Sequence, residues 1–209
     1  MMLKFMTRIR GLSRPLSISM LVLAYAGFGA GLRAQETTLT FDPAQAQINF
    51  TTSDTIHTVH GAFKLKQGSI TFDPATGKAT GQLVVDSTSE DTGSSTRDRK
   101  VRKDVLESQT YPEIVFVPDR LEGAVPREGD FDVKVHGAFR IHGGDHDLTL
   151  TVHAQHKPEG LAVLSDFDVP YQKWGMKNPS TLFIRVSDTV HISVHAVARS
   201  AAATSATAR

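Results

Sequence analysis

The nine histidines are the residues whose type and spacing could do chemistry, because imidazole binds metal ions and exchanges protons near neutral pH. Eight of them occur in four pairs, which are His57 and His60, His142 and His146, His153 and His156, and His191 and His195. In the first and third pairs the residues are three apart, and side chains at this spacing point to opposite faces of a strand. These two pairs therefore cannot bind one metal ion together.

The best candidate for a metal site combines His142, His146 and Asp145 at a Gly-Gly turn. His191 and His195 share a strand face, but they stand about 13 Å apart at 3.3 Å per residue. A metal ion there would need further ligands from neighbouring strands. We expect solvent-facing histidines and no metal site, and a metal-dependent enzyme built on either group is the alternative.

Other catalytic signatures are absent from the sequence. It has no Cys nucleophile, no Gly-rich phosphate loop, no Gly-x-Ser-x-Gly motif and no His-Glu-x-x-His motif. We therefore expect a protein that is not an enzyme and that has no cofactor of its own.

The elements that must position these histidines are strands. Apolar residues alternate with polar ones over residues 133–141, 148–155 and 190–196, and turn-forming Asp, Pro and Gly separate such runs, as at 73–77 and 157–160. Strands with one apolar, buried face and one polar, solvent-exposed face are typical of an antiparallel sheet. About eight such strands without long helical crossovers predict a soluble, all-β antiparallel barrel, although a two-sheet sandwich fits the alternation almost as well.

An outer-membrane barrel is disfavoured, because it would carry apolar residues outside and aromatic girdles at both ends, and the chain has only 11 Phe, 3 Tyr and 1 Trp.

One segment breaks the strand pattern. Residues 94–107 predict a short surface helix laid over one barrel end, with Val101, Val105 and Leu106 as its narrow apolar stripe.

The two ends of the chain differ from the middle. Residues 1–34 have the basic, apolar and small-residue order of a cleavable signal peptide, and their apolar stretch of about 15 residues is short of the roughly 20 that span a membrane. We expect export, a barrel domain over 35–197 and a disordered Ala/Ser/Thr tail over 198–209. Cleavage removes five basic residues and changes the net charge from +1 to −4, which disfavours a nucleic-acid partner.

The apolar face of the barrel is the second candidate site. Its aliphatic and phenyl side chains would stabilise a buried acyl or isoprenoid chain by about 0.8 kcal/mol per CH₂, but the same side chains could simply fill the core. The predicted ligand contacts are Val59, Phe63, Val85, Ile114, Phe116, Val135, Phe139, Leu150, Phe167 and Trp174.

Several short motifs follow one another along the chain, and the main ones are Gly68-Ser-Ile-Thr-Phe-Asp-Pro74, Arg97-Asp98, Tyr111-Pro-Glu-Ile-Val-Phe116, Gly137-Ala-Phe-Arg-Ile-His-Gly143 and Trp174-Gly-Met176. Their order resembles that of the YceI-like family of periplasmic proteins. The resemblance spans about residues 39–197. It implies a lipocalin-like, up-and-down antiparallel barrel with one or two short helices at one end.

The resemblance also implies a periplasmic protein that holds a polyisoprenoid or similar amphiphilic lipid, without catalysis and without stable membrane insertion. A bound isoprenoid or isoprenoid quinone would be its ligand, and a homodimer is left open. Two segments depart from the family pattern, the His-rich hairpin 143–147 and the aromatic-poor strand 55–61, so we expect a smaller or wetter tunnel mouth. A filled barrel that acts through its surface as a stress or assembly factor is a further alternative.

Overall fold

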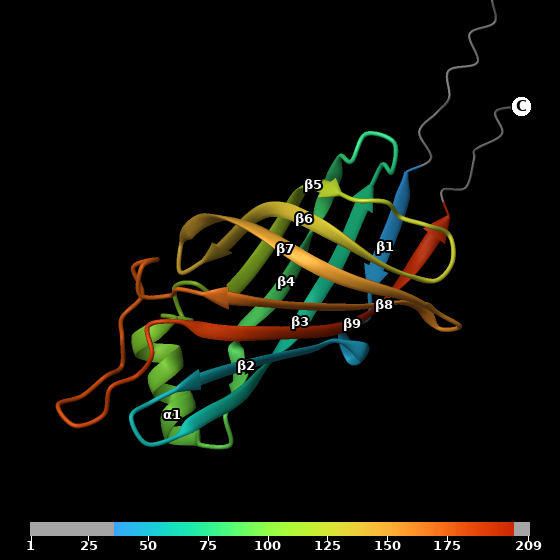
Figure 1. The fold of residues 1–209 in the computed structure, drawn as a ribbon. Helices are drawn as coiled ribbons and strands as arrows, with labels where there is room; N and C mark the ends of the chain where they lie inside the picture. The colour runs from blue at the N-terminus through green and yellow to red at the C-terminus, as the bar shows by residue number, and fades with distance from the viewer. Residues whose placement is uncertain (1–35, 203–209) are drawn as a thin grey trace, which may run out of the picture. The chain divides into compact units, whose positions relative to one another are not determined.

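The computed structural model describes residues 36–202, and these residues form one closed antiparallel barrel (Figure 1). Eight strands follow one another around the barrel in sequence order, from β2 through β9, and β9 pairs back onto β2. The strands are β1 (Thr37–Phe41), β2 (Gln47–Ser53), β3 (Thr58–Phe72), β4 (Ala79–Asp91), β5 (Glu113–Glu122), β6 (Asp130–Ile141), β7 (Gly144–Lys157), β8 (Gly160–Val169) and β9 (Val190–Ala202). The predicted up-and-down barrel is confirmed. The predicted signal peptide lies outside the described residues.

The ninth strand, β1, continues the line of β2 toward the other end of the barrel. Both strands lie between β3 and β9, and the 3-10 turn η1 (Pro43–Gln45) separates them. Asp42 caps this turn by accepting a hydrogen bond from the backbone N–H of Ala44, and Pro43 interrupts the strand because it has no N–H to donate.

The pairing of β1 also corrects a boundary. Strand β9 runs to Ala202, beyond residue 197, where the sequence predicts that the barrel ends. Its residues 198–202 pair with Phe41 through Thr37. A ladder uses backbone groups, so small residues can join it, and Ala198, the first of these residues, is fully buried. Residues 198–202 therefore belong to β9 and not to the predicted tail, whose remaining residues, 203–209, lie outside the described residues.

The helical segment predicted over 94–107 is present. It consists of helix α1 (Ser95–Lys100), followed at once by the π-helical turn η2 (Val101–Val105), and it lies across one end of the barrel (Figure 1). Residues 95–106 are called the lid from here on. The loops 54–57 and 170–189 lie at the same barrel end, because β2 and β8 finish there while β3 and β9 begin there.

Two irregularities in strand pairing change which side chains point inward. The register between β3 and β4 shifts between Leu65 and Gln67, and again between Ala62 and Lys64. As a result, Phe63 and Leu65 face the interior before the shift at residues 65–67, whereas Ile70 and Phe72 face it after that shift. A strict two-residue period fails at this strand because the shift between Leu65 and Gln67 adds one unpaired residue to β3, whereas the other shift adds residues to β4.

No helix within residues 36–202 is both long enough and apolar enough to cross a membrane.

Candidate functional site

The interior of the barrel is hollow. It holds a cavity of about 290 Å³, close to the lower end of the roughly 300–1,000 Å³ range that is common for small-molecule sites. Every strand contributes to its wall, and the lining is almost entirely aliphatic and phenyl. Three groups of buried residues surround it, one at the lid end around Leu106 and Met176, and two farther along the barrel around Phe72 and Phe116.

Three lining residues carry hydroxyl groups. Ser165 donates a hydrogen bond to the backbone oxygen of Thr151 at 2.9 Å, and Tyr171 donates one to the backbone oxygen of Ser187 at 2.7 Å. Burial raises the pKa of Tyr171 to about 12, which keeps its phenol protonated. The third hydroxyl, Oγ1 of Thr52, is buried and has no hydrogen-bond partner within residues 36–202.

Eight of the ten predicted ligand contacts line the cavity. They are Phe63, Val85, Ile114, Phe116, Val135, Phe139, Leu150 and Phe167. Val59 is buried but does not reach the cavity wall. Trp174 also lies outside the wall, because its indole stacks on the ring of His146 at 4.1 Å and packs against Phe139 at 5.8 Å. That any of these residues contacts a ligand stays a prediction.

Sequence reasoning missed three parts of the wall. The first comes from β1 and β2, where Leu39, Phe41, Ile48 and Phe50 point inward. The alternation of apolar and polar residues along these two strands could have predicted that they point inward. The second is the stretch of β3 beyond the register shift, which no periodicity reveals. The third is the loop 170–189, which reaches the cavity although it is not a strand.

The lid closes one end of the cavity with its apolar stripe. Val101, Val105 and Leu106 line the cavity from above, as the predicted amphipathic pattern requires. The π-helical turn brings Val105 and Leu106 together on the inner side, and both are buried. Such wide turns are rare and occur often at functional sites.

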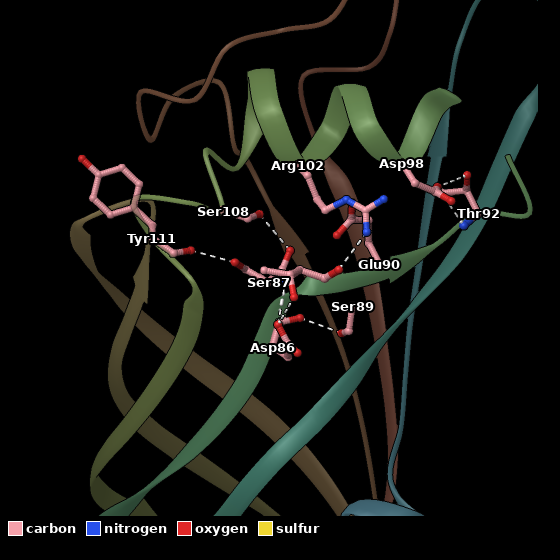
Figure 2. A network of polar contacts seen from close by, with 10 residues as sticks. Asp86, Ser87, Ser89, Glu90, Thr92, Asp98, Arg102, Ser108 and Tyr111 are labelled. Atoms are coloured by element: carbon pink, nitrogen blue, oxygen red, sulfur yellow. Dashed lines mark hydrogen bonds and ion pairs between the residues drawn. The ribbon is translucent and has the colours of Figure 1, made fainter. Parts of the chain in front are cut away.

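Polar contacts hold the lid to the end of β4 (Figure 2). Asp98 accepts hydrogen bonds from the backbone N–H and the hydroxyl of Thr92, and Arg97 donates to the same residue. One turn later, Arg102 donates to the backbone oxygen of Thr88 at 3.0 Å. The segment after the lid is fastened to β4 as well, because Ser108 donates to the backbone oxygen of Ser87.

Glu90 is the unusual member of this network. Its side chain is completely buried, and Nε of Arg102 lies 3.1 Å from its Oε1. Neither carboxylate oxygen has a hydrogen-bond partner within the described chain. Burial is the main reason that the pKa of Glu90 rises to about 7; Asp98 and Asp86 add to the rise, and Arg102 opposes it. The lid therefore rests on a carboxyl group that changes charge near neutral pH.

The candidate metal residues are engaged elsewhere. Asp145 forms a two-pronged ion pair with Arg140, the ring of His146 stacks on Trp174, and the ring of His142 packs on Tyr111. Within residues 36–202 the structure has no group of three or more His, Asp or Glu placed to hold a metal ion.

Three other histidines on the strands are bound to acidic neighbours. His191 lies between Asp168, at 2.9 Å, and Asp166, at 3.7 Å, on the outer face of the barrel. His136 is held in the same way by Asp119 and Asp147, which raise its pKa, and His153 bonds to Asp132. These are cross-strand pairs on a solvated sheet face.

Comparison with known proteins agrees with this geometry. A family model described as the YceI-like domain matches residues 39–198. Among solved structures, BcnA of Burkholderia cenocepacia superposes with a TM-score of 0.62 at 21% identity, covering 75% of this chain and 98% of BcnA. A YceI protein of Campylobacter jejuni gives 0.55 at 21% identity, covering 70% and 87%.

A third structure is a polyisoprenoid-binding domain from Saccharophagus degradans implicated in plant cell wall breakdown. It gives a TM-score of 0.59 at 17% identity and covers 78% of this chain and 98% of that domain. At these identities the structural matches establish the fold alone. No curated protein matches the chain.

Proposed function

This chain belongs to the YceI-like family, and we propose that it is an exported, non-catalytic protein that holds one polyisoprenoid or similar long apolar chain inside its barrel. The observation that carries the proposal is the cavity of about 290 Å³, whose wall consists of apolar side chains from every strand. The polyisoprenoid-binding domain of Saccharophagus degradans, which has the same fold, supports this class of ligand.

The chemistry of the wall fits an extended hydrocarbon better than a compact polar molecule. Each CH₂ group moved from water into such a wall contributes about 0.8 kcal/mol, so an unbranched or isoprenoid chain gains affinity in proportion to its buried length. The phenyl rings of Phe116, Phe139 and Phe167 offer flat surfaces along the cavity.

The lid end is the place where such a ligand would enter. The lid is held to β4 by side-chain contacts rather than by strand pairing, so it can move without breaking the barrel. Loops are the mobile parts of a barrel, whereas a closed ladder has no free edge.

Uptake of an isoprenoid quinone tests the binding proposal. The protein is incubated with the quinone in mild detergent and separated by gel filtration, and the absorbance of the quinone is followed in the protein peak. We expect about one quinone per chain. A protein that elutes without quinone under conditions where it is folded contradicts the proposal.

Export has its own test. Cell fractionation and N-terminal sequencing of the purified protein should find it in the periplasm, beginning near Gln35. Recovery in the cytoplasm with residues 1–34 intact would overturn this part of the proposal.

A further inference from the structure

Two tight turns lie side by side at the lid end of the barrel, and both expose large apolar side chains. In the loop between β2 and β3, Ile56 is 67% exposed. In the loop between β8 and β9, Leu182 is 93% exposed and Phe183 is 87% exposed, and Ile184 beside them is 39% exposed. These residues are the exposed large apolar side chains of the described chain. They are called the apolar tips here.

Hydrogen bonds fix both turns and join them. The backbone N–H of Thr181 donates to the oxygen of Ile184, which places Leu182 and Phe183 at the two corners of a turn. Asp54 closes the other turn by accepting from the N–H groups of Ile56 and His57. The backbone N–H of Arg185 donates to the hydroxyl of Thr55 at 2.9 Å, and this bond ties the two turns together.

The backbone conformation of these turns does not require the large apolar residues that occupy them. Corner positions of tight turns favour Gly, Asn, Asp, Ser and Pro, since these residues suit the backbone and are well solvated. Ile56, Leu182 and Phe183 stand at three such corners, and most of the surface of each residue is exposed. A cluster of exposed apolar groups of this kind marks an interaction surface.

The charge around the tips indicates the partner. The segments that connect strands at this barrel end, 54–57, 92–112, 142–143 and 170–189, contain eight Lys and Arg but only five acidic residues, whereas residues 35–209 as a whole carry 18 Lys and Arg against 22 acidic residues. Lys100, Lys177 and Arg185 are exposed in these segments. A positive barrel end on a negative protein fits an anionic surface.

The tips also continue directly into the cavity wall. Val186, two residues after Ile184, lines the cavity, and so do Pro179 of the same loop and Val105 of the lid. Figure 1 shows that the loop between β8 and β9, the loop between β2 and β3, and α1 project from the same end of the barrel. The surface that presents the tips is therefore the one that surrounds the entrance closed by the lid.

We propose that this end of the barrel docks on the surface of an anionic lipid bilayer, with Ile56, Leu182 and Phe183 inserted among the lipid headgroups and the nearby Lys and Arg on their phosphates. Apolar tips supply burial and cations supply attraction, and neither alone gives stable binding at a membrane surface. The proposal extends the proposed carriage of a lipid, because it places the entrance of the cavity against a lipid source, but docking itself does not require an occupied cavity.

Sedimentation with vesicles tests the docking. The protein is purified from the cell envelope and mixed with vesicles of phosphatidylglycerol and phosphatidylethanolamine, or of phosphatidylcholine alone. All variants are prepared in the same way, so that any contribution of residues 1–34 is common to them. We expect binding to the anionic vesicles that falls with added salt, and weaker binding to phosphatidylcholine.

Two double variants separate the two contributions. Leu182→Ser with Phe183→Ser should weaken vesicle binding about tenfold or more, since it removes most of the exposed apolar surface. Lys177→Glu with Arg185→Glu should weaken binding to anionic vesicles to a similar extent. The matched control is Arg127→Glu with Lys157→Glu, which makes the same charge change at the opposite end of the barrel and should leave vesicle binding within about twofold.

Two results would overturn the proposal. One is equal vesicle binding by the wild type and the serine variant, provided that their melting temperatures agree. The other is a wild type that self-associates through the tips, seen as a dimer in sedimentation velocity that the serine variant abolishes, with no vesicle binding. Quinone uptake in detergent is measured separately, so a failure of docking and a failure of lipid binding give different results.

Discussion

The carboxylate of Glu90 lies 3.1 Å from Nε of Arg102, at the junction of β4 and the lid, and it is fully buried without a hydrogen bond within the described residues. A buried ion pair is costly when its partners lack further hydrogen bonds, because desolvation opposes their attraction. Burial accordingly raises the pKa of Glu90 from 4.5 to about 7. The contact between lid and barrel therefore depends on pH.

Glu90→Gln should remove this dependence. Between pH 4.5 and 7 the folded protein binds a proton at Glu90 that the unfolded chain does not, so its stability falls as the pH rises through this window. Glutamine imitates the protonated form. We expect the variant to match the wild type near pH 5 and to be more stable at pH 8, by up to about 3 kcal/mol.

Urea unfolding at the two pH values measures the difference. Glu122→Gln is the matched control, because Glu122 pairs with Arg120 on the surface and its pKa is lowered rather than raised. This control should leave the stability nearly unchanged at either pH, because solvent screens an exposed ion pair. A Glu90→Gln variant that is less stable than the wild type at pH 8 would show that the ion pair is net stabilising.

Two hydroxyls of the cavity wall, those of Thr52 and Ser165, should respond differently to removal. Thr52→Val replaces an unpaired buried hydroxyl with a methyl group of similar size, and it should stabilise the ligand-free protein by about 1 kcal/mol. Ser165→Ala removes a hydroxyl that donates to Thr151, and it should destabilise by about 1 kcal/mol. Thermal unfolding of both variants checks the opposite signs. If Thr52→Val is clearly destabilising, its hydroxyl has a partner.

A large side chain placed in the cavity should block it. Val152 lines the cavity on β7, whereas Thr151 next to it is exposed on the outer face. Val152→Trp should fold, because the cavity offers space, and should lose at least tenfold in quinone uptake. Thr151→Trp adds the same side chain outside and should bind as the wild type does. Equal quinone uptake by both variants would mean that the ligand lies elsewhere.

The single tryptophan reports on His146. The two rings are parallel within 7° at 4.1 Å, and desolvation lowers the pKa of His146 below its usual value of 6.5. A protonated imidazole quenches a stacked indole, so the fluorescence of Trp174 should fall on acidification with a midpoint below pH 6.5. His146→Asn should abolish this transition, and the exposed control His153→Asn should leave it unchanged. A midpoint above pH 6.5 would contradict the desolvation of His146, and a fluorescence that does not change with pH would contradict the stacking.

The regular strands of the barrel could be predicted from the sequence, and its irregular parts could not. Alternation placed Val133, Val135, Phe139 and Ile141 on the inner face of β6, and the structure agrees. The same rule fails along β3, because its two register shifts are set by backbone pairing with β4, which leaves no pattern in the side chains.

The lid also has features that the sequence predicts and contacts that it does not. Its apolar stripe of Val101, Val105 and Leu106 is a local pattern, and the sequence predicts both the helix and the side that it buries. The contact of Arg102 with Glu90 joins a lid residue to a strand twelve positions away and needs the tertiary fold. The apolar tips depend in the same way on two loops that are distant in sequence and joined by Thr55 and Arg185.

Native mass spectrometry of the protein purified from a cell envelope tests the central claim most directly. If the hollow barrel carries a long apolar chain, the spectrum should show an adduct of one isoprenoid or comparable lipid per protein, and Val152→Trp purified in parallel should lack it. Wild-type protein that appears only at its bare mass, and that gains no adduct when isoprenoid quinone is supplied, would contradict the claim.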